Sequence, residues 1–213
     1  MQKVSRFASL RTAALVCALV GGFGFGTAAA QAEDTQAKIR TSIDTMIQAI
    51  EDENDPMRNR MFFELRIIGN ESVPALVDLM KDERVKVREY AIHTVSYIDD
   101  ERWIDPTIAI LENDAVASTR AMACRALART QDTPVLEEAG RRAMSALLNA
   151  LENDEEIVQM DAAHALGWFG DPSARSALEA AAQSSSELVS EFARMALEDL
   201  DHAEKMRQRQ AGG

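Results

Sequence analysis

A 14-residue motif recurs along the chain, and this internal repetition restricts the possible folds more than any other feature. Residues 158–171 (VQMDAAHALGWFGD) align without a gap on residues 87–100 (VREYAIHTVSYIDD), where a small residue, a histidine, a branched apolar residue and a closing aspartate coincide. Further copies begin at Met57, Thr119 and Val189, so successive copies start 30, 32, 39 and 31 residues apart. Such periods are typical of structural units that stack and bury their apolar faces against one another.

Each copy has the periodicity of an α-helix. Apolar or small residues recur at every fourth position, for example Val158, Ala162 and Leu166, which places them on one helical stripe. A second apolar segment follows after a short turn, as at residues 73–80 and 104–111. The sequence therefore predicts an all-α fold, a right-handed α-solenoid of about four to five helical hairpins. The expected repeats cover residues 55–82, 83–114, 115–154, 155–185 and 186–200.

Proline and glycine mark the expected ends of the helices. Asp-Pro pairs at 55–56, 105–106 and 171–172 predict helix starts, because aspartate can cap free backbone amides and proline fits the first turn. Gly69 and Gly170 lie where a helix must end and turn. The helices of each hairpin are therefore expected to be joined by short turns.

Residues outside the repeats flank the solenoid at both ends, and those at the N-terminal end are expected to cover it. Such covers are needed because a terminal repeat has an unpaired apolar face. An apolar stripe from Ile39 to Ile50 predicts an amphipathic helix at about residues 35–53, within a capping segment of residues 33–54. At the other end, the polar tail 201–213 is expected to extend the last helix before it frays.

The first 32 residues have the form of a signal peptide. Three basic residues and no acidic one precede an uncharged stretch at 12–30, and Ala30-Gln31-Ala32 matches a signal peptidase site. Cleavage after Ala32 would send the mature chain to the periplasm or outside the cell. The alternative is an uncleaved membrane anchor, because about 18 uncharged residues nearly span a bilayer.

The mature chain would be strongly acidic. Loss of the leader leaves 20 Lys and Arg against 35 Asp and Glu, a net charge of −15. Duplex DNA and anionic membranes would repel such a protein on average, so neither a nucleic-acid partner nor stable membrane insertion after cleavage is expected. Cys124 would be the one remaining cysteine, which excludes an internal disulfide, and a buried thiol is favoured there over a reactive one.

The repeats resemble the short bacterial HEAT repeat. The pattern Val-Arg-x-x-Ala-x-x-x-Leu-Gly-x-x-Gly-Asp of that family is matched in part by residues 87–91 and in part by residues 162–171, and residues 73–76 are similar to the start of its second helix. The resemblance covers about residues 55–200. It implies an extended binding surface, usually lined by the second helices of the pairs.

The residue types offer little that indicates catalysis. His93 and His164 occupy the same position in their copies, but two repeats would separate them by about 20 Å, too far for one metal ion. Each histidine is therefore expected to stay within its own helix pair. The sequence contains no phosphate-binding glycine loop and no nucleophile elbow. We therefore predict a protein that is not an enzyme and has no catalytic residue, cofactor or metal.

An exported HEAT-repeat scaffold or adaptor for protein–protein interaction is the favoured function. The alternative is a lyase or chaperone of the phycobilin-lyase type, whose sequences resemble these repeats. Those proteins act in the cytosol on coloured light-harvesting subunits, so the leader counts against that alternative. HEAT-like DNA glycosylases are a third class, and the net negative charge counts against it because those enzymes need a basic groove.

The third copy indicates where a protein or peptide partner would bind. It is about eight residues longer than the others, and its apolar stripe predicts a second helix at about residues 134–152, roughly two turns longer than its neighbours, unless Gly140 breaks it. The alternative is that the polar side chains near this helix form an ordinary solvated face. The predicted binding residues on the inner face are Asp78, Arg141, Arg142, Asn149 and Glu152.

Overall fold

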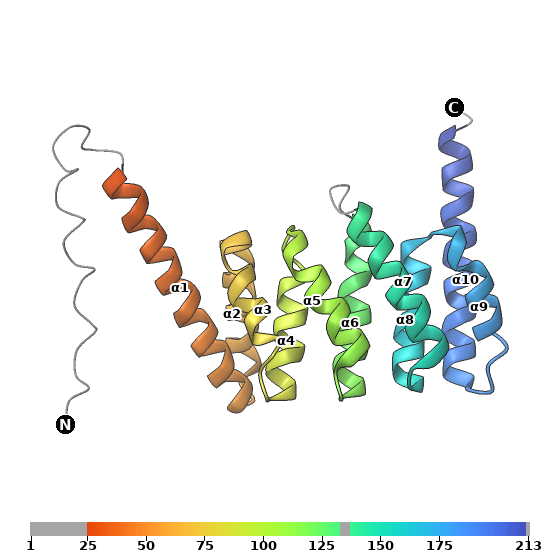
Figure 1. Cartoon of the computed structure of the whole chain (residues 1–213), viewed down its shortest axis with the longest axis horizontal. Helices are drawn as coiled ribbons and strands as arrows, with labels where there is room; N and C mark the ends of the chain where they lie inside the picture. Colours follow the sequence, from red (N-terminus) through yellow and green to blue (C-terminus); the bar gives the residue numbers. More distant parts are fainter. Residues whose placement is uncertain (1–24, 133–136, 212–213) are drawn as a thin grey trace, which may run out of the picture.

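The repeats fold into a row of helices. The computed structural model describes residues 25–132 and 137–211, and every regular element within these ranges is a helix. Figure 1 shows the helices standing side by side from the N-terminal α1 to the C-terminal α10. The α-helices are α1 (Phe25–Glu51), α2 (Asp55–Ile68), α3 (Val73–Leu79), α4 (Val85–Val95), α5 (Ile104–Asn113), α6 (Ala117–Leu127), α7 (Glu137–Asn153), α8 (Glu156–Phe169), α9 (Arg175–Ala181) and α10 (Glu187–Ala211).

The helices pair as the sequence repeat predicts. The five copies of the motif form α2, α4, α6, α8 and α10, which pack one against the next and are here called the first-helix row. The intervening helices α3, α5, α7 and α9 are the second-helix row, in which α7 contacts both α5 and α9. The predicted all-α solenoid is confirmed.

The stripe of each motif forms the core between the two rows. Val158, Ala162 and Leu166 of α8 have no exposed surface. Small residues let neighbouring first helices approach closely, and a Cβ atom built on Gly167 would lie only 2.6 Å from the Cα atom of Ala196 in α10. The second-helix row contributes buried leucines to this core, one each from α3, α5 and α9 and two from α7. These leucines are Leu76, Leu111, Leu147, Leu151 and Leu178.

Two of the three predicted helix starts are correct to within one residue. α2 begins at the first Asp-Pro pair, although Asn54 rather than Asp55 caps it by accepting a hydrogen bond from the amide of Met57. α5 begins at Ile104, one residue before the second pair. At the third pair the prediction is wrong in detail, because Asp171 caps a short 3-10 turn that precedes α9 and not α9 itself.

The two glycines end their helices as predicted. Gly69 follows α2 with a φ of 75°, and Gly170 follows α8 with a φ of 63°. Side chains disfavour this left-handed region, so glycine is suited to both positions. Each turn reverses the chain and allows the next helix to pack against the one before.

The N-terminal helix is longer than predicted. α1 begins at Phe25, ten residues before the expected start, and so runs through the expected cleavage site at Ala32. It packs against α2 and α4, as a capping helix should. Residues 28–34 are all exposed, and Ile39 is the first buried residue of the helix. Loss of residues 28–32 would therefore remove no buried side chain.

The structure also bears out the two extended helices. α7 covers residues 137–153 without a break at Gly140, and its 17 residues compare with 10 in α5 and 7 in α9. The expected first residues of this helix, 134–136, lie outside the described residues. α10 continues to Ala211, so the polar tail does extend the last helix. No helix of the described ranges combines the length and the hydropathy that a membrane span requires.

The close approach of α8 and α10 predicts opposite effects for two glycine substitutions. Gly167→Ala gains helix propensity but forces its methyl group against the backbone of α10, so we expect a net loss of about 1–2 kcal/mol in the free energy of unfolding. Gly140→Ala is the matched control, because its Cβ would meet only the Phe169 ring at 3.7 Å, and we expect it to stabilise by up to about 1 kcal/mol. Urea unfolding followed by circular dichroism measures both, and equal effects would contradict this packing.

Candidate functional site

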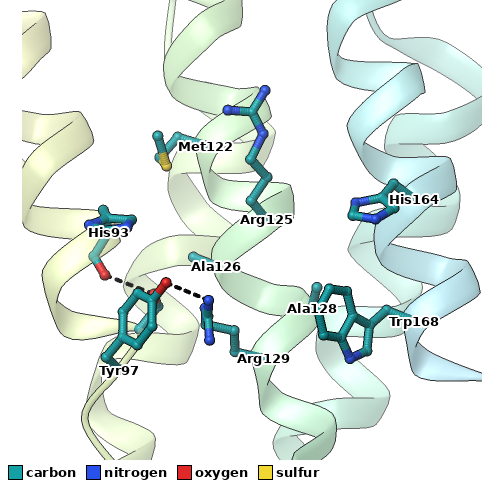
Figure 2. A pocket seen from close by; sticks show the side chains of 10 residues that line it. His93, Tyr97, Met122, Arg125, Ala126, Ala128, Arg129, His164 and Trp168 are labelled. Atoms are coloured by element: carbon teal, nitrogen blue, oxygen red, sulfur yellow. Dashed lines mark hydrogen bonds between the residues drawn. The ribbon is translucent and has the colours of Figure 1, made fainter.

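A hollow of about 430 Å³ opens on the first-helix row between α4, α6 and α8. Figure 2 shows His93 and Tyr97 on one wall and His164 and Trp168 on the opposite wall. Met122 and two arginines from α6 and the turn after it lie between these walls. Three consecutive repeats thus contribute side chains to one site.

The hollow reflects two positions of the repeated motif. The seventh and the eleventh residue of each copy point away from the core, and none of these ten side chains is buried. Because adjacent helices place them side by side, they form a continuous surface, here called the outer strip. The seventh residues are Phe63, His93, Arg125, His164 and Met195, and the eleventh residues are Ile67, Tyr97, Arg129, Trp168 and Asp199.

Arg129 is held in position by an aromatic ring. Its guanidinium carbon lies 3.7 Å from the centroid of the Tyr97 ring, and it donates a hydrogen bond to the phenolic oxygen of the same residue. Arg66 of α2 approaches this ring as well, at 5.6 Å. Arg129 makes no ion pair with any residue that the structure describes. Its charge therefore remains available inside the hollow.

Arg125 is already paired. Its Nη2 atom lies 2.6 Å from a carboxylate oxygen of Asp161 in α8, and that aspartate side chain is only 5% exposed. The pair links α6 to α8 beside the hollow. The unbalanced positive charge of the site is therefore concentrated at Arg129.

His93 lies among aromatic rings and cations. The centroid of its ring lies 5.1 Å from the centroids of both Phe62 and Tyr97. Burial lowers its pKa below the usual value, and repulsion by Arg129 and Arg58 lowers it further. His93 is thus kept neutral at neutral pH, as an aromatic surface rather than a charge.

The ends of the outer strip are apolar and exposed. On α2, Phe63 and Ile67 are 55% and 85% exposed, and beyond the hollow Trp168 and Met195 are 54% and 49% exposed. The His164 ring packs edge-on against the Trp168 ring, with the two centroids 5.9 Å apart. Exposed aromatic and apolar side chains that gather on one face are typical of binding surfaces.

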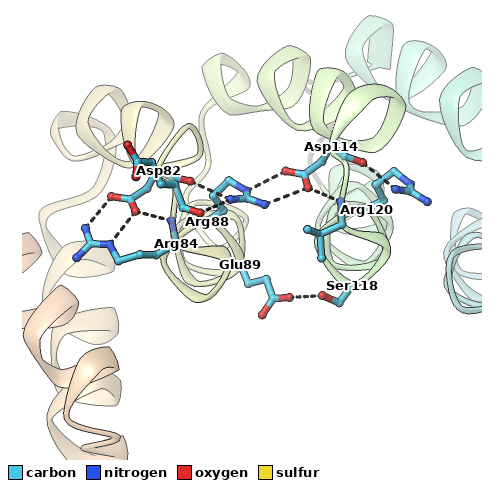
Figure 3. Close-up of polar contacts among 9 residues, drawn as sticks. Asp82, Arg84, Arg88, Glu89, Asp114, Ser118 and Arg120 are labelled. Carbon is cyan, nitrogen blue, oxygen red and sulfur yellow. Dashed lines mark hydrogen bonds and ion pairs between the residues drawn. The ribbon is translucent and has the colours of Figure 1, made fainter.

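Ion pairs between successive repeats hold the walls of the hollow in register (Figure 3). Arg88 in α4 contacts Asp114, which precedes α6, through Nε and Nη2 at 2.8 and 3.1 Å. Arg120 in α6 contacts Asp154, which precedes α8, at distances of 2.6 to 3.1 Å. Each arginine also donates to a backbone carbonyl of the preceding turn, at Asp82 and Asp114 respectively. We call these two pairs the arginine–aspartate ladder.

The residues predicted to bind a partner lie on the second-helix row, and the structure does not gather all of them. Asp78 is on α3, and α5 stands between this helix and α7. Arg142 pairs with Asp105 of α5 at 2.9 Å, and Arg141 pairs with Glu138 within α7. These arginines do stand at the extended end of α7, as the sequence predicts, but their charges are engaged within the chain.

The other two predicted residues lie farther along α7. Asn149 lines a second hollow, of about 290 Å³, between α5, α7 and the turns that follow them. Glu152 is exposed on the same helix. The walls of this second hollow are mainly polar, and it contains the charged pair Arg120 and Asp154 of the ladder.

The structure places both histidines and the cysteine. His93 on α4 and His164 on α8 line opposite walls of the same hollow, so the two side chains face one space although each stays on its own helix. The residues that the structure describes contain no group of three or more side chains able to hold a metal ion. Cys124 is completely buried, and burial raises the pKa of its thiol, which is the unreactive environment that the sequence favoured.

The sequence indicates the hollow through the residue types at a second set of motif positions, which differ from those of the core stripe. The stripe uses the first, fifth and ninth residues of the motif, whereas the outer strip uses the seventh and eleventh. A soluble helix normally places small polar or charged residues on such outward positions. Aromatic residues, histidine, methionine and isoleucine fill seven of the ten positions here, and Arg125, Arg129 and Asp199 are the three charged ones.

Comparison with known proteins agrees with this architecture. A family model described as HEAT repeats matches residues 104–198, which include α6, α8 and most of the hollow. The chain is a HEAT-repeat protein. No curated protein matches this HEAT-repeat chain.

One solved structure shows the same fold over most of its length. A chain in the complex of CpcE and CpcF of phycocyanin lyase from Nostoc is similar with a TM-score of 0.64 and 22% sequence identity, over 74% of this chain and 98% of that chain. Human deoxyhypusine hydroxylase in complex with glycerol aligns with 16% identity over 84% of this chain and 100% of that chain, at a TM-score of 0.30 that is too low to indicate a shared fold. At this level of identity the first likeness concerns the fold alone.

The cations around His93 predict an unusual titration. In an NMR titration we expect the midpoint of His93 to lie below the usual value near 6.5, because burial and Arg129 disfavour the imidazolium. Arg129→Gln should raise this midpoint, whereas Arg142→Gln on the second-helix row should leave it unchanged. A midpoint that does not respond to Arg129→Gln would contradict the proposed electrostatics.

The same pKa shift predicts how stability changes with pH. Between the lowered pKa of folded His93 and the usual value, the unfolded chain binds more protons than the folded one, so the free energy of unfolding increases with pH. The contribution of His93 is complete above the usual value and is lost as the pH falls toward the lowered one. His93→Gln should therefore flatten the decline in stability between pH 7 and pH 5, as measured by urea unfolding.

Proposed function

We propose that this HEAT-repeat protein is an exported, non-catalytic scaffold that binds a protein partner through the outer strip. The observation that carries the proposal is the hollow, in which three repeats present two aromatic walls and an unpaired arginine. Aromatic residues, methionine and arginine are the types enriched in protein interfaces and among their dominant contacts.

The chemistry around the hollow favours binding over catalysis. Catalytic acids and bases need a partner that positions and activates them. His93 is instead packed between rings, and Arg125 is neutralised by Asp161. Cys124, the one thiol in the described residues, has no exposed surface.

The two rows differ in the kinds of side chain that they expose. On the second-helix row, charged side chains pair with each other, as Arg142 does with Asp105 and Lys81 with Asp78. On the first-helix row, large apolar side chains such as Phe63 and Trp168 remain exposed. Burial of exposed apolar surface provides most of the free energy of association, whereas exposed ion pairs contribute little. The outer strip is therefore the stronger candidate for the partner site.

Export is proposed from the leader. The basic start, the uncharged stretch and Ala30-Gln31-Ala32 fit a cleaved signal peptide. The exposed start of α1 is compatible with cleavage after Ala32, because none of residues 28–34 contributes to the core. The site of action would then be the periplasm or the medium.

Cleavage can be tested on the protein produced from its full sequence. We expect the protein in the periplasmic or secreted fraction to begin at Glu33, as mass spectrometry of its N-terminal peptide would show. Ala30→Arg should block processing and leave the chain membrane-associated, because signal peptidase requires a small residue there. A chain that stays in the cytosol with its leader intact would contradict export.

A second candidate function is suggested by the similar solved structure. The similarity to the phycocyanin lyase chain extends over 98% of that chain. The hollow between the aromatic walls could take a flat tetrapyrrole. The leader counts against a role in the cytosol. A shift in bilin absorbance on mixing biliverdin with the purified chain, lost in Trp168→Ala, would favour this lyase or chaperone function over the scaffold.

The partner site can be tested by affinity capture from the exported fraction. We expect the mature wild-type chain and Arg141→Glu/Arg142→Glu to retain the same partner, and Arg129→Gln/Trp168→Ala to lose it. Loss of two dominant contacts should weaken binding at least tenfold. The opposite pattern would place the partner on α7, and failure of every chain to retain a protein would contradict the scaffold function.

A further inference from the structure

We propose that the partner of this scaffold binds as an extended peptide whose central acidic residue reaches Arg129 and whose flanking apolar residues cover the two ends of the outer strip. This inference rests on the proposed function and adds the chemistry of the partner. It is carried by the order of side chains along the strip, which runs from apolar at α2 through cationic at α6 to aromatic and apolar at α8 and α10.

A carboxylate fits the centre of the strip because a guanidinium is already held there. Arg129 is stacked on Tyr97 and hydrogen-bonded to it, so little rotational freedom is left to lose when an anion binds. Asp161, a nearly buried carboxylate of α8, is engaged by Arg125. No carboxylate of the described residues pairs with Arg129, so a carboxylate of the partner can pair with it.

Apolar anchors fit the two ends. Phe63 and Ile67 expose large surfaces on α2, one repeat before the wall formed by His93. Trp168 and Met195 expose comparable surfaces on the far side of the hollow. A peptide that covers both ends would bury apolar area on each side of its acidic centre and shield the central ion pair from water, which strengthens it.

The geometry of the repeat sets the length of the peptide. Neighbouring helices lie about 8–10 Å apart, so the five first helices span roughly 40 Å. An extended chain advances about 3.3 Å per residue, and about 12 residues therefore cross the strip. Three repeats separate the apolar positions on α2 from those on α8, which puts the acidic residue near the middle of such a segment.

The strip also discriminates against uniformly acidic ligands. At its C-terminal end α10 exposes Glu198 and Asp199, close to Met195. These carboxylates repel a second acidic group, and the whole chain has a net charge of −12. A nucleic acid, which carries a phosphate at every residue, would meet this repulsion along its length. A peptide with acidic residues only in its centre would avoid it.

The experiment is selection of random 12-residue peptides displayed on phage by the full mature chain. We expect enrichment of peptides with one or two central Asp or Glu residues between apolar or aromatic residues. Enrichment should disappear with Arg129→Gln and with Trp168→Ala, and should persist with Arg142→Gln, a matched loss of one arginine on the second-helix row. Peptides without acidic residues, or peptides that bind Arg129→Gln equally well, would overturn the inference.

A selected peptide allows the central contact to be measured. In fluorescence anisotropy, replacing its acidic residue by the corresponding amide should weaken binding to the wild type about tenfold or more, and should have little further effect on Arg129→Gln. Trp168 should also change its emission on binding, because it is half exposed whereas Trp103 is buried. Additive effects of the two changes would show that the carboxylate does not contact Arg129.

The outcomes separate this inference from the proposed function. If no peptide is enriched but affinity capture still yields a partner that depends on Arg129 and Trp168, the scaffold function stands and the extended acidic-centred segment is wrong. If peptides are selected that depend on Arg142 and not on Arg129, both the site and the inference are wrong. Quenching of Trp168 by biliverdin without any peptide enrichment would favour a small tetrapyrrole as the ligand.

Discussion

The spacing between first helices is the constraint on which the rest of this structure depends, and the arginine–aspartate ladder fixes it. Arg88 and Arg120 each join one repeat to the turn that opens the next, through bidentate contacts that are mostly buried. Buried pairs of this kind contribute less to net stability than to the choice of one register, because desolvation offsets much of their attraction. After the fourth repeat the ladder gives way to neutral contacts, such as the hydrogen bond from Ser190 to the carbonyl of Ala182. The rungs thus coincide with α4, α6 and α8, the walls of the hollow.

The hollow results from this spacing and from the different residue types that the copies carry at equivalent positions of the motif. In copies two, three and four the first, fifth and ninth residues are buried, and in the terminal copies Met57 and Leu197 are half-buried, so the seventh and eleventh residues point outward. In copies two and four these positions carry His93 with Tyr97 and His164 with Trp168, whereas copy three has two arginines. Rings on two walls with cations between them therefore require no special loop or insertion. They require only that three adjacent repeats stay in register.

Much of the fold could be predicted from the sequence, because the period of the repeat and the positions of glycine and proline are local signals. Gly69 and Gly170 are examples, because each follows its helix with a positive φ that few other residues tolerate. The site could not be predicted as readily, because it depends on which faces of different helices meet. His93 and His164 lie two repeats apart, and a hollow much wider than a metal site is nevertheless lined by both. Arg141 and Arg142 of α7 are neighbouring arginines in an acidic chain, yet both pair within the chain.

The distribution of charge explains why a partner would be selected at short range. The exposed acidic residues of the second-helix row, together with a net charge of −12, repel acidic molecules at a distance. At physiological salt this repulsion decays over about 8 Å, which is comparable to the separation of two neighbouring helices. An acidic residue that enters the hollow is therefore attracted mainly by Arg129, while its apolar neighbours supply the area that must be buried. A segment with charges throughout would gain little from one arginine and would be repelled by the rest of the chain. Arg129 thus selects for the composition of the partner, and the exposed rings on either side provide the affinity.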